Sequence, residues 1–174
     1  MPFTPLHMGP GLALKALLGG RCSLGAFAVA QVAMDIEPLV GMLRGAEILH
    51  GTTHTVWAAL LIAALVAPAT PWLAGPFVRR WNRELLHYHL PWLIEPETFS
   101  SGAVVCGALL GTLTHLALDS VMHADMHPLA PWTASNPWMG AMSIPTLHTL
   151  CLLSGVVGMV VYVLRARFLH RTHQ

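Results

Sequence analysis

The chain has 174 residues, of which 55% are hydrophobic and only 10% charged, and its formal net charge at pH 7 is +1. Soluble domains carry roughly 25% charged residues, so this composition is typical of a membrane protein, and its length predicts a single domain over residues 1–174. With so small a net charge there is no basic stripe to follow phosphates, which argues against nucleic acid as a partner.

The first apolar region, residues 11–34, is interrupted in its middle by charged residues and glycines. Each apolar half is too short to cross a bilayer, so we expect two half-length helices, Pro10–Leu18 and Leu24–Met34, folded back as a re-entrant or interfacial hairpin. A single full span is the alternative. The hairpin would place His7, which precedes it, and Asp35, which follows it, on the same side of the membrane.

Three later apolar runs are long enough to cross a membrane, namely Val56–Val78, Phe99–Met122 and Ile144–Leu164. The first contains three prolines, which predict either a kinked span or a shorter helix that ends in a loop after Ala67. In the second, Gly107 and Gly111 would let another helix approach closely. The predicted fold is therefore an all-α polytopic membrane bundle with about three spanning helices plus the N-terminal half-helix hairpin.

The distribution of basic residues predicts how the bundle is oriented. Six of the nine lysines and arginines follow the first and the last of the three runs, at Arg79, Arg80, Arg83, Arg165, Arg167 and Arg171. The positive-inside rule makes these ends cytoplasmic. The loop Asp125–Ser143 contains no lysine or arginine, so we expect it on the non-cytoplasmic side, together with the polar residues that flank the other ends of the runs.

The functional prediction starts from the second run. His115, Asp119 and His123 recur at every fourth position, so on a helix their side chains would lie along one face at roughly 6 Å steps. In apolar surroundings an imidazole and a carboxylate must be hydrogen-bonded, paired or bound to a metal. A histidine–aspartate hydrogen bond that joins two helices is the simpler explanation of this motif taken alone.

Further imidazoles and carboxylates lie near the ends of the other apolar runs. His7 precedes the hairpin, Asp35 lies in a loop that would follow it, and His54 precedes the first span. We prefer His54 to His50, because the glycine between them would leave His50 outside the helix. The candidate metal ligands are His7, Asp35, His54, His115, Asp119 and His123.

This set of nitrogen and oxygen ligands suits zinc or, with more oxygen ligands, manganese or iron. The three cysteines lie far apart within apolar runs and are expected to be buried rather than ligating. The set is larger than one catalytic zinc requires, whereas a carboxylate shared between two metals would use all of it. Such a site activates water, which predicts a hydrolase of phosphoesters. Asp125 and Glu37 are the candidate catalytic carboxylates, either as proton shuttles or as residues that orient a ligand.

Several segments together resemble a known family. They are the opening Met1-Pro2-Phe3-Thr4-Pro5-Leu6-His7, then Asp35, Gly51-Thr52-Thr53-His54-Thr55 and His115-x-x-x-Asp119-Ser120. In this order they closely resemble the bacterial inner-membrane proteins called membrane-bound metal-dependent hydrolases. That family is similar to the zinc-dependent phospholipase C and single-strand nuclease superfamily. The resemblance implies that Asp35, His54, His115 and Asp119 hold one metal, and that His7 and Asp119 contribute to another.

The expected protein is thus a multi-pass hydrolase of the bacterial inner membrane whose site opens at the non-cytoplasmic face. Because the site would lie at headgroup depth, membrane lipid is an expected partner and the phosphoester is either a small molecule or lipid-linked. Two other functions fit the same residues. A non-enzymatic protein with a structural or sensing metal predicts a closed four-ligand site. A transporter, or a haem-type membrane protein, predicts ionisable groups spread across the membrane depth, whereas we expect them to cluster at one face.

Overall fold

The computed structural model describes residues 5–172, and within this range all regular elements are helices, which confirms the all-α class. The α-helices are α1 (Met8–Leu18), α2 (Leu24–Leu43), α3 (Val56–His87), α4 (Ser101–Met122) and α5 (Ile144–Thr172). Short 3-10 turns lie between or before them, at η1 (Pro5–His7), η2 (Gly19–Arg21), η3 (Thr52–His54) and η4 (Pro91–Leu93). In the described part of the chain, α2 to α5 are long and apolar enough to cross a membrane. The first four residues of the opening motif lie outside the described range.

Helix α2 is longer than the half-helix predicted from the sequence. It continues beyond Met34 to Leu43, which makes it 20 residues long and able to span. The predicted loop at Asp35 is therefore wrong, since Asp35 and Glu37 both project from a helix that passes through Pro38. A proline beside two carboxylates suggested a helix end, but membrane helices tolerate proline when neighbouring groups satisfy the freed carbonyl.

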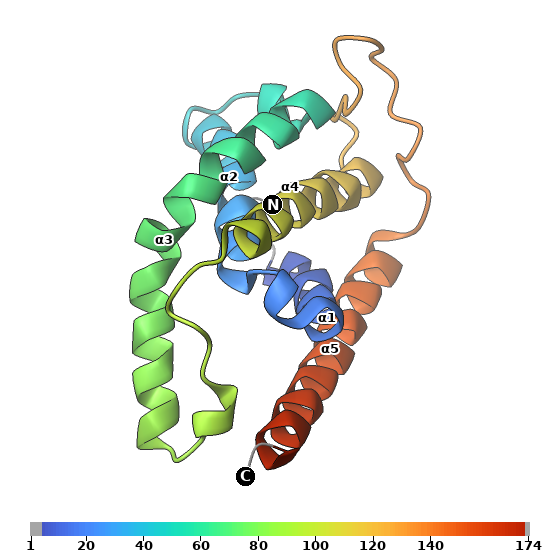
Figure 1. Ribbon diagram of the computed structural model, residues 1–174. Coiled ribbons are helices and arrows are strands. Elements are labelled where there is room, and N and C mark those ends of the chain that lie inside the picture. The colour runs from blue at the N-terminus through green and yellow to red at the C-terminus, as the bar shows by residue number, and fades with distance from the viewer. Residues whose placement is uncertain (1–4, 173–174) are drawn as a thin grey trace.

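Helix α3 also runs through its prolines, so the kinked-span alternative is correct and no loop follows Ala67. Figure 1 shows that α3 bends within its length, as expected for a helix with prolines in its interior. The helix begins after Thr55, whose hydroxyl accepts a hydrogen bond from the Ala58 N–H at 3.4 Å. This cap fixes the start of α3 directly after His54.

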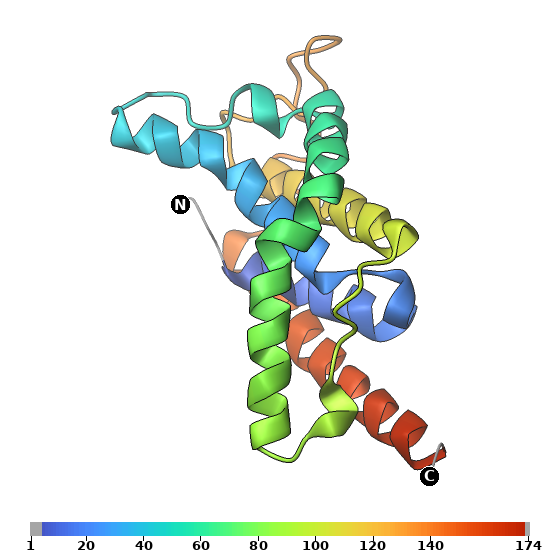
Figure 2. The ribbon, with the colours of Figure 1, turned by 60° about the vertical axis from the view of Figure 1, so that its left-hand side comes forward.

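The helices pack as two groups that meet near the middle of the molecule (Figures 1 and 2). Helix α2 packs against α3 and α4, and α1 packs mainly against α5. The face of α4 toward α2 carries the two predicted glycines at close contacts. A Cβ on Gly107 would lie 2.2 Å from the Ser23 carbonyl oxygen, and one on Gly111 would lie 2.7 Å from the Ala30 Cβ. This close approach brings the next turns of α4, which carry His115 and Asp119, against α2.

Charged residues away from this contact hold α1 in place. Lys15 is buried, and its ammonium lies 2.7 Å from a carboxylate oxygen of Glu95, whose other oxygen accepts a hydrogen bond from the Tyr162 hydroxyl. Arg165 donates to the carbonyl of Ala16 at 2.9 Å, near the end of α1. The lysine that interrupts the first apolar run is thus paired, as a charge inside a membrane protein must be. These contacts fix α1 on α5 and so fix His7, which directly precedes α1.

The two ends of the molecule differ in their loops and charges. In both views the C-terminal ends of α3 and α5 lie at one end, and the α2–α3 loop and the loop over residues 123–143 lie toward the other (Figures 1 and 2). The arginines that follow the apolar runs therefore share one end, as the sequence predicted.

Candidate metal centre

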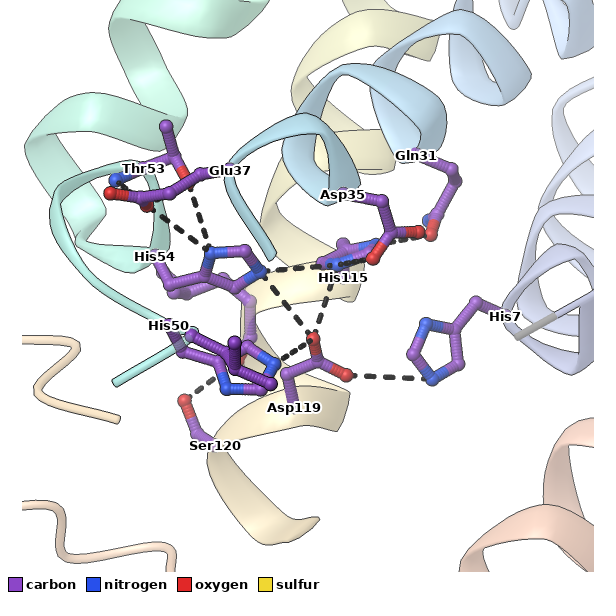
Figure 3. A network of polar contacts seen from close by, with 12 residues as sticks. His7, Gln31, Asp35, Glu37, His50, Thr53, His54, His115, Asp119 and Ser120 are labelled. Carbon is purple, nitrogen blue, oxygen red and sulfur yellow. Dashed lines mark hydrogen bonds and ion pairs between the residues drawn. The ribbon is translucent and has the colours of Figure 1, made fainter. Parts of the chain in front are cut away.

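Asp119 lies at the centre of a cluster of buried imidazoles (Figure 3). Its Oδ2 lies 3.2 Å from Nε2 of His115, 3.5 Å from Nε2 of His54 and 3.9 Å from Nε2 of His50. Its Oδ1 faces the opposite direction and lies 3.7 Å from Nε2 of His7. Helix α4, the α2–α3 loop and the turn before α1 thus meet at one carboxylate. The structure brings together residues that the sequence predicted to converge.

The distances between the possible ligand atoms of this cluster match those expected for atoms that bind one metal ion. The distance between Nε2 of His54 and Nε2 of His115 is 3.4 Å, so with Asp119 Oδ2 they form a triangle with sides of 3.2–3.5 Å. Two ligands bound to tetrahedral zinc at about 2.1 Å lie about 3.4 Å apart. Asp35 Oδ1 lies 3.5 Å from Nε2 of His115 and is placed to serve as a further ligand. The residues therefore fit a zinc-type ion.

Hydrogen bonds on the far side of His115 determine which ring nitrogen carries the proton. Its Nδ1 lies 2.7 Å from Oε1 of Gln31, and the amide nitrogen of Gln31 donates to the Gly111 carbonyl at 3.0 Å. The Gln31 oxygen must accept, so Nδ1 of His115 carries a hydrogen, and in the neutral form of the ring Nε2 presents a lone pair to Asp119. Two acceptors facing each other at 3.2 Å repel unless a cation or a proton lies between them.

The same arrangement is repeated at His54 and His50. Nδ1 of His54 lies 3.0 Å from the Thr53 hydroxyl, which itself donates to Glu37, so His54 Nδ1 is the donor. Nδ1 of His50 donates to Asp125 at 2.9 Å. Together with His115, three imidazoles thus direct Nε2 lone pairs toward one carboxylate. Metal-binding histidines characteristically donate their other N–H to such an oxygen acceptor, which orients the ring.

Glu37 and Asp125, the two candidate catalytic carboxylates, both hold the α2–α3 loop. Glu37 accepts the backbone N–H groups of Thr52 and Thr53 at 3.0 and 2.8 Å, and Asp125 accepts that of His50 at 3.1 Å. Burial alone would raise the pKa of Asp125, but the hydrogen bonds from the His50 and Leu49 backbone and from the His50 ring hold this pKa well below its ordinary range. We expected these carboxylates either to shuttle protons or to orient a ligand. Their contacts correspond to the second role.

His7 lies on the other side of Asp119 and is 3% exposed. Within residues 5–172, neither of its ring nitrogens has a hydrogen-bond partner, although both are buried. Burial lowers the pKa of His7 to about 4, despite the nearby Asp119, so the ring is neutral at neutral pH and offers a lone pair. A buried polar group without a partner is costly, and a metal ion between His7 and Asp119 Oδ1 would satisfy it.

Two candidate metal groups share Asp119. One consists of His7, His115 and Asp119, the other of His50, His54 and Asp119, and within each group the possible ligand atoms lie within 4.8 Å of one another. Oδ1 of Asp119 faces His7, whereas Oδ2 faces both His54 and His115. This geometry fits a carboxylate that bridges two metals, which is the arrangement expected from the size of the ligand set.

His123 does not continue the predicted series along α4. The helix ends at Met122, and His123 has an extended backbone with φ −113° and ψ 121°, which turns its side chain off the ligand face. Its ring stacks on His50 with the centroids 4.0 Å apart. It forms a separate group with His50 and Asp125. His115 and Asp119 therefore share a helix face, whereas His123 lies beside the centre.

The chain was compared with known protein families, curated proteins and solved structures. A model of the family DUF4184, described as a domain of unknown function, matches residues 1–173. The chain belongs to the DUF4184 family. No curated protein and no solved structure matches it.

Two residues of the centre in this DUF4184 protein were missed by the sequence analysis. His50 was set aside because of the glycine at position 51, yet it is 5% exposed and faces Asp119. Gln31 was overlooked, although a glutamine inside an apolar run is a signal that it has a buried partner. The spacing of His50 and His54, four residues apart, was the available signal for the first residue.

Gln31 provides a test of ligand orientation in this DUF4184 protein. We expect Gln31→Leu to weaken zinc binding by roughly 10–100-fold, the usual cost of losing a residue that orients a metal-binding histidine. Gln31→Glu keeps an oxygen acceptor for Nδ1 of His115 and should retain most of the affinity. The measurement is competition for zinc with a chelator. Equal affinities of the two variants would contradict the assigned role.

Proposed function

We propose that this DUF4184 protein is a membrane-bound, metal-dependent hydrolase that acts on phosphoesters with one or two divalent ions, of which zinc fits best. The observation that carries the proposal is the direction of three imidazoles. Each of His50, His54 and His115 has its Nδ1 held by an oxygen acceptor and its Nε2 aimed at Asp119 within 3.9 Å. Such convergence of lone pairs around a buried carboxylate is stable only with positive charge at its centre.

The contacts support the two ligand sets that the family resemblance implies. Asp35, His54, His115 and Asp119 Oδ2 would hold one ion, with His50 beside them, and His7 with Asp119 Oδ1 would contribute to a second. When bound, divalent ions polarise a phosphoryl oxygen and lower the pKa of water at the site. The protein itself orients the histidine ligands. Gln31, Thr53 and Asp125 fix the ring orientations, and the burial of the cluster excludes bulk water.

Placement in the bacterial inner membrane, with the site toward the non-cytoplasmic face, is part of the proposal. The arginines at the ends of α3 and α5 lie away from the α2–α3 loop, which carries His50 and His54 (Figures 1 and 2). The positive-inside rule assigns the arginine-rich end to the cytoplasm. The gathering of the imidazoles around one carboxylate supports a localised site rather than a transport path.

A structural or sensing metal is the second candidate, and the burial of the centre favours it. His54, His115 and Asp119 are at most 3% exposed. The two functions differ in whether a coordination position exchanges. With cobalt in place of zinc, added phosphate should change the visible absorption of the hydrolase, whereas a closed structural site would show no change.

Hydrolysis of bis(para-nitrophenyl) phosphate by the purified, zinc-loaded protein tests the proposal. We expect turnover by the wild type and by His87→Ala, whose histidine is exposed at the end of α3. We expect none above background by His115→Ala, because that variant lacks the imidazole closest to Asp119. Equal rates for His115→Ala and the wild type, or no turnover by the zinc-loaded wild type, would contradict the proposal.

A further inference from the structure

A cavity of about 580 Å³ opens beside the metal centre. One part of its lining is polar and includes His50, Thr52 and His127, and another part is apolar and includes Ile48, Trp57 and Trp132. This volume is within the range of roughly 300–1,000 Å³ that is typical of small-molecule sites. The lining has the amphipathic character of a site for a molecule with a polar head and an apolar tail.

His50 connects the cavity to the metal centre. His50 lines the cavity, and its Nε2 lies 3.9 Å from Asp119 Oδ2. His54 and His115, by contrast, are 0% exposed, so the ligands deeper in the cluster are closed to solvent. Of the imidazoles that face Asp119 Oδ2, His50 is therefore the one at which a molecule in the cavity would reach the centre.

The apolar part of the cavity lies where the chain is expected to meet the membrane surface. Trp57 is in the first turn of the spanning helix α3 and is 40% exposed, and Trp132 in the loop after α4 is 74% exposed. Tryptophan is enriched at the boundary between headgroups and acyl chains. Ile48 is 66% exposed on the same cavity. An apolar chain in the cavity would thus continue into the lipid along α3.

We propose that this cavity holds the apolar tail of the substrate, so that the enzyme acts on a lipid phosphoester. The phosphate would lie at His50 and the metal centre, with the alkyl chain against Trp57 and Trp132. This inference rests on the proposed hydrolase function. In the reaction, water adds to phosphorus, the bond from phosphorus to the alcohol oxygen breaks, and the alcohol leaves with one proton while the other product keeps the phosphate.

Binding of two phosphates that differ only in their chains tests the inference. Dodecyl phosphate and methyl phosphate are titrated calorimetrically into zinc-loaded protein in nanodiscs of dioleoyl phosphatidylcholine. We expect Trp132→Ala to weaken binding of dodecyl phosphate by about tenfold, equivalent to the burial of roughly two methylene groups, and to leave methyl phosphate unchanged. Trp138→Ala is the matched control, because Trp138 is an exposed tryptophan of the same loop that does not line the cavity.

Each outcome separates the inference from the proposed function. Partition of the probe into the bilayer is the same for all variants, so only the difference between Trp132→Ala and Trp138→Ala reports on the cavity. If these two variants bind dodecyl phosphate equally and still bind methyl phosphate, the cavity does not hold the apolar tail, and the hydrolase proposal still stands. Failure of the zinc-loaded wild type to bind either phosphate would overturn both. Ile48→Ala, at a second exposed lining residue, should repeat the effect of Trp132→Ala.

Discussion

Asp119→Asn lowers the affinity for zinc by more than about 100-fold, because the loss of a residue that only orients a ligand already costs 10–100-fold. Asp119 contacts four imidazoles, that of His7 through Oδ1 and the other three through Oδ2. Asparagine keeps the shape of the side chain but removes its charge and one acceptor. The measurement is metal content after purification, together with competition by a chelator. Glu47→Gln is the control, since Glu47 is an exposed carboxylate of the α2–α3 loop.

The same variant separates metal binding from folding. Without metal, the Asp119 carboxylate faces imidazole lone pairs, whereas the amide of asparagine can donate hydrogen bonds to them. The metal-free Asp119→Asn protein should therefore unfold at the same temperature as the metal-free wild type or a higher one. Zinc should raise the unfolding temperature of the wild type and not that of the variant, because only a form that binds the ligand is stabilised by it. Full zinc occupancy in Asp119→Asn would rule out the proposed centre.

Gly107→Ala destabilises the metal-free protein by about 1–3 kcal/mol, the usual cost of overpacking a close contact. The added Cβ would lie 2.2 Å from the carbonyl oxygen of Ser23, and a backbone atom cannot move as a flexible side chain would. The N–H of Ser23 is itself bound to the Ala103 carbonyl at 2.9 Å, which ties this segment to α4. The helices α2 and α4 must therefore separate, so zinc affinity should fall as well, because Asp35 lies on α2 and His115 on α4.

Gly102→Ala is the matched control in the same helix. Apart from the adjoining residues and the backbone of its own helix, no atom of the described chain lies within 4 Å of a Cβ built at Gly102, so alanine should be neutral there or stabilise the helix by up to about 1 kcal/mol. Thermal unfolding of both variants in one detergent, without metal, provides the comparison. If the two variants unfold at the same temperature, the close contact between α2 and α4 does not exist as described.

The sequence predicted the parts of the site that depend on local geometry. The spacing of His115 and Asp119 places both on one helix face whatever the surroundings, and the small residues Gly107 and Gly111 on that helix indicated a close neighbour. The convergence with His54 and Asp35 followed from the positive-inside rule, which placed these ends of the apolar runs on the same side of the membrane. These predictions needed only helix periodicity, the cost of burying polar groups and the distribution of arginines.

The remaining features depended on tertiary contacts that no local pattern specifies. Asp35 was assigned to a loop because of Pro38, but packing against α3 and α4 stabilises a helix through that proline. His50 was set aside because of a local glycine, yet Asp125, which lies 75 positions away in the sequence, holds its ring toward Asp119. Conversely, His123 has the right spacing and leaves the series because α4 ends one residue earlier.

X-ray absorption at the zinc edge of the loaded protein tests the metal centre most directly. The structure predicts a shell of nitrogen and oxygen at about 2.0–2.2 Å with the multiple scattering of several imidazoles, and no sulfur, because the ligand set contains no cysteine. A bridging Asp119 further predicts a second zinc about 3.5–4 Å away in doubly loaded protein. Sulfur ligands, or a shell without imidazole scattering, would contradict the convergence of His54, His115 and Asp119 on a metal ion.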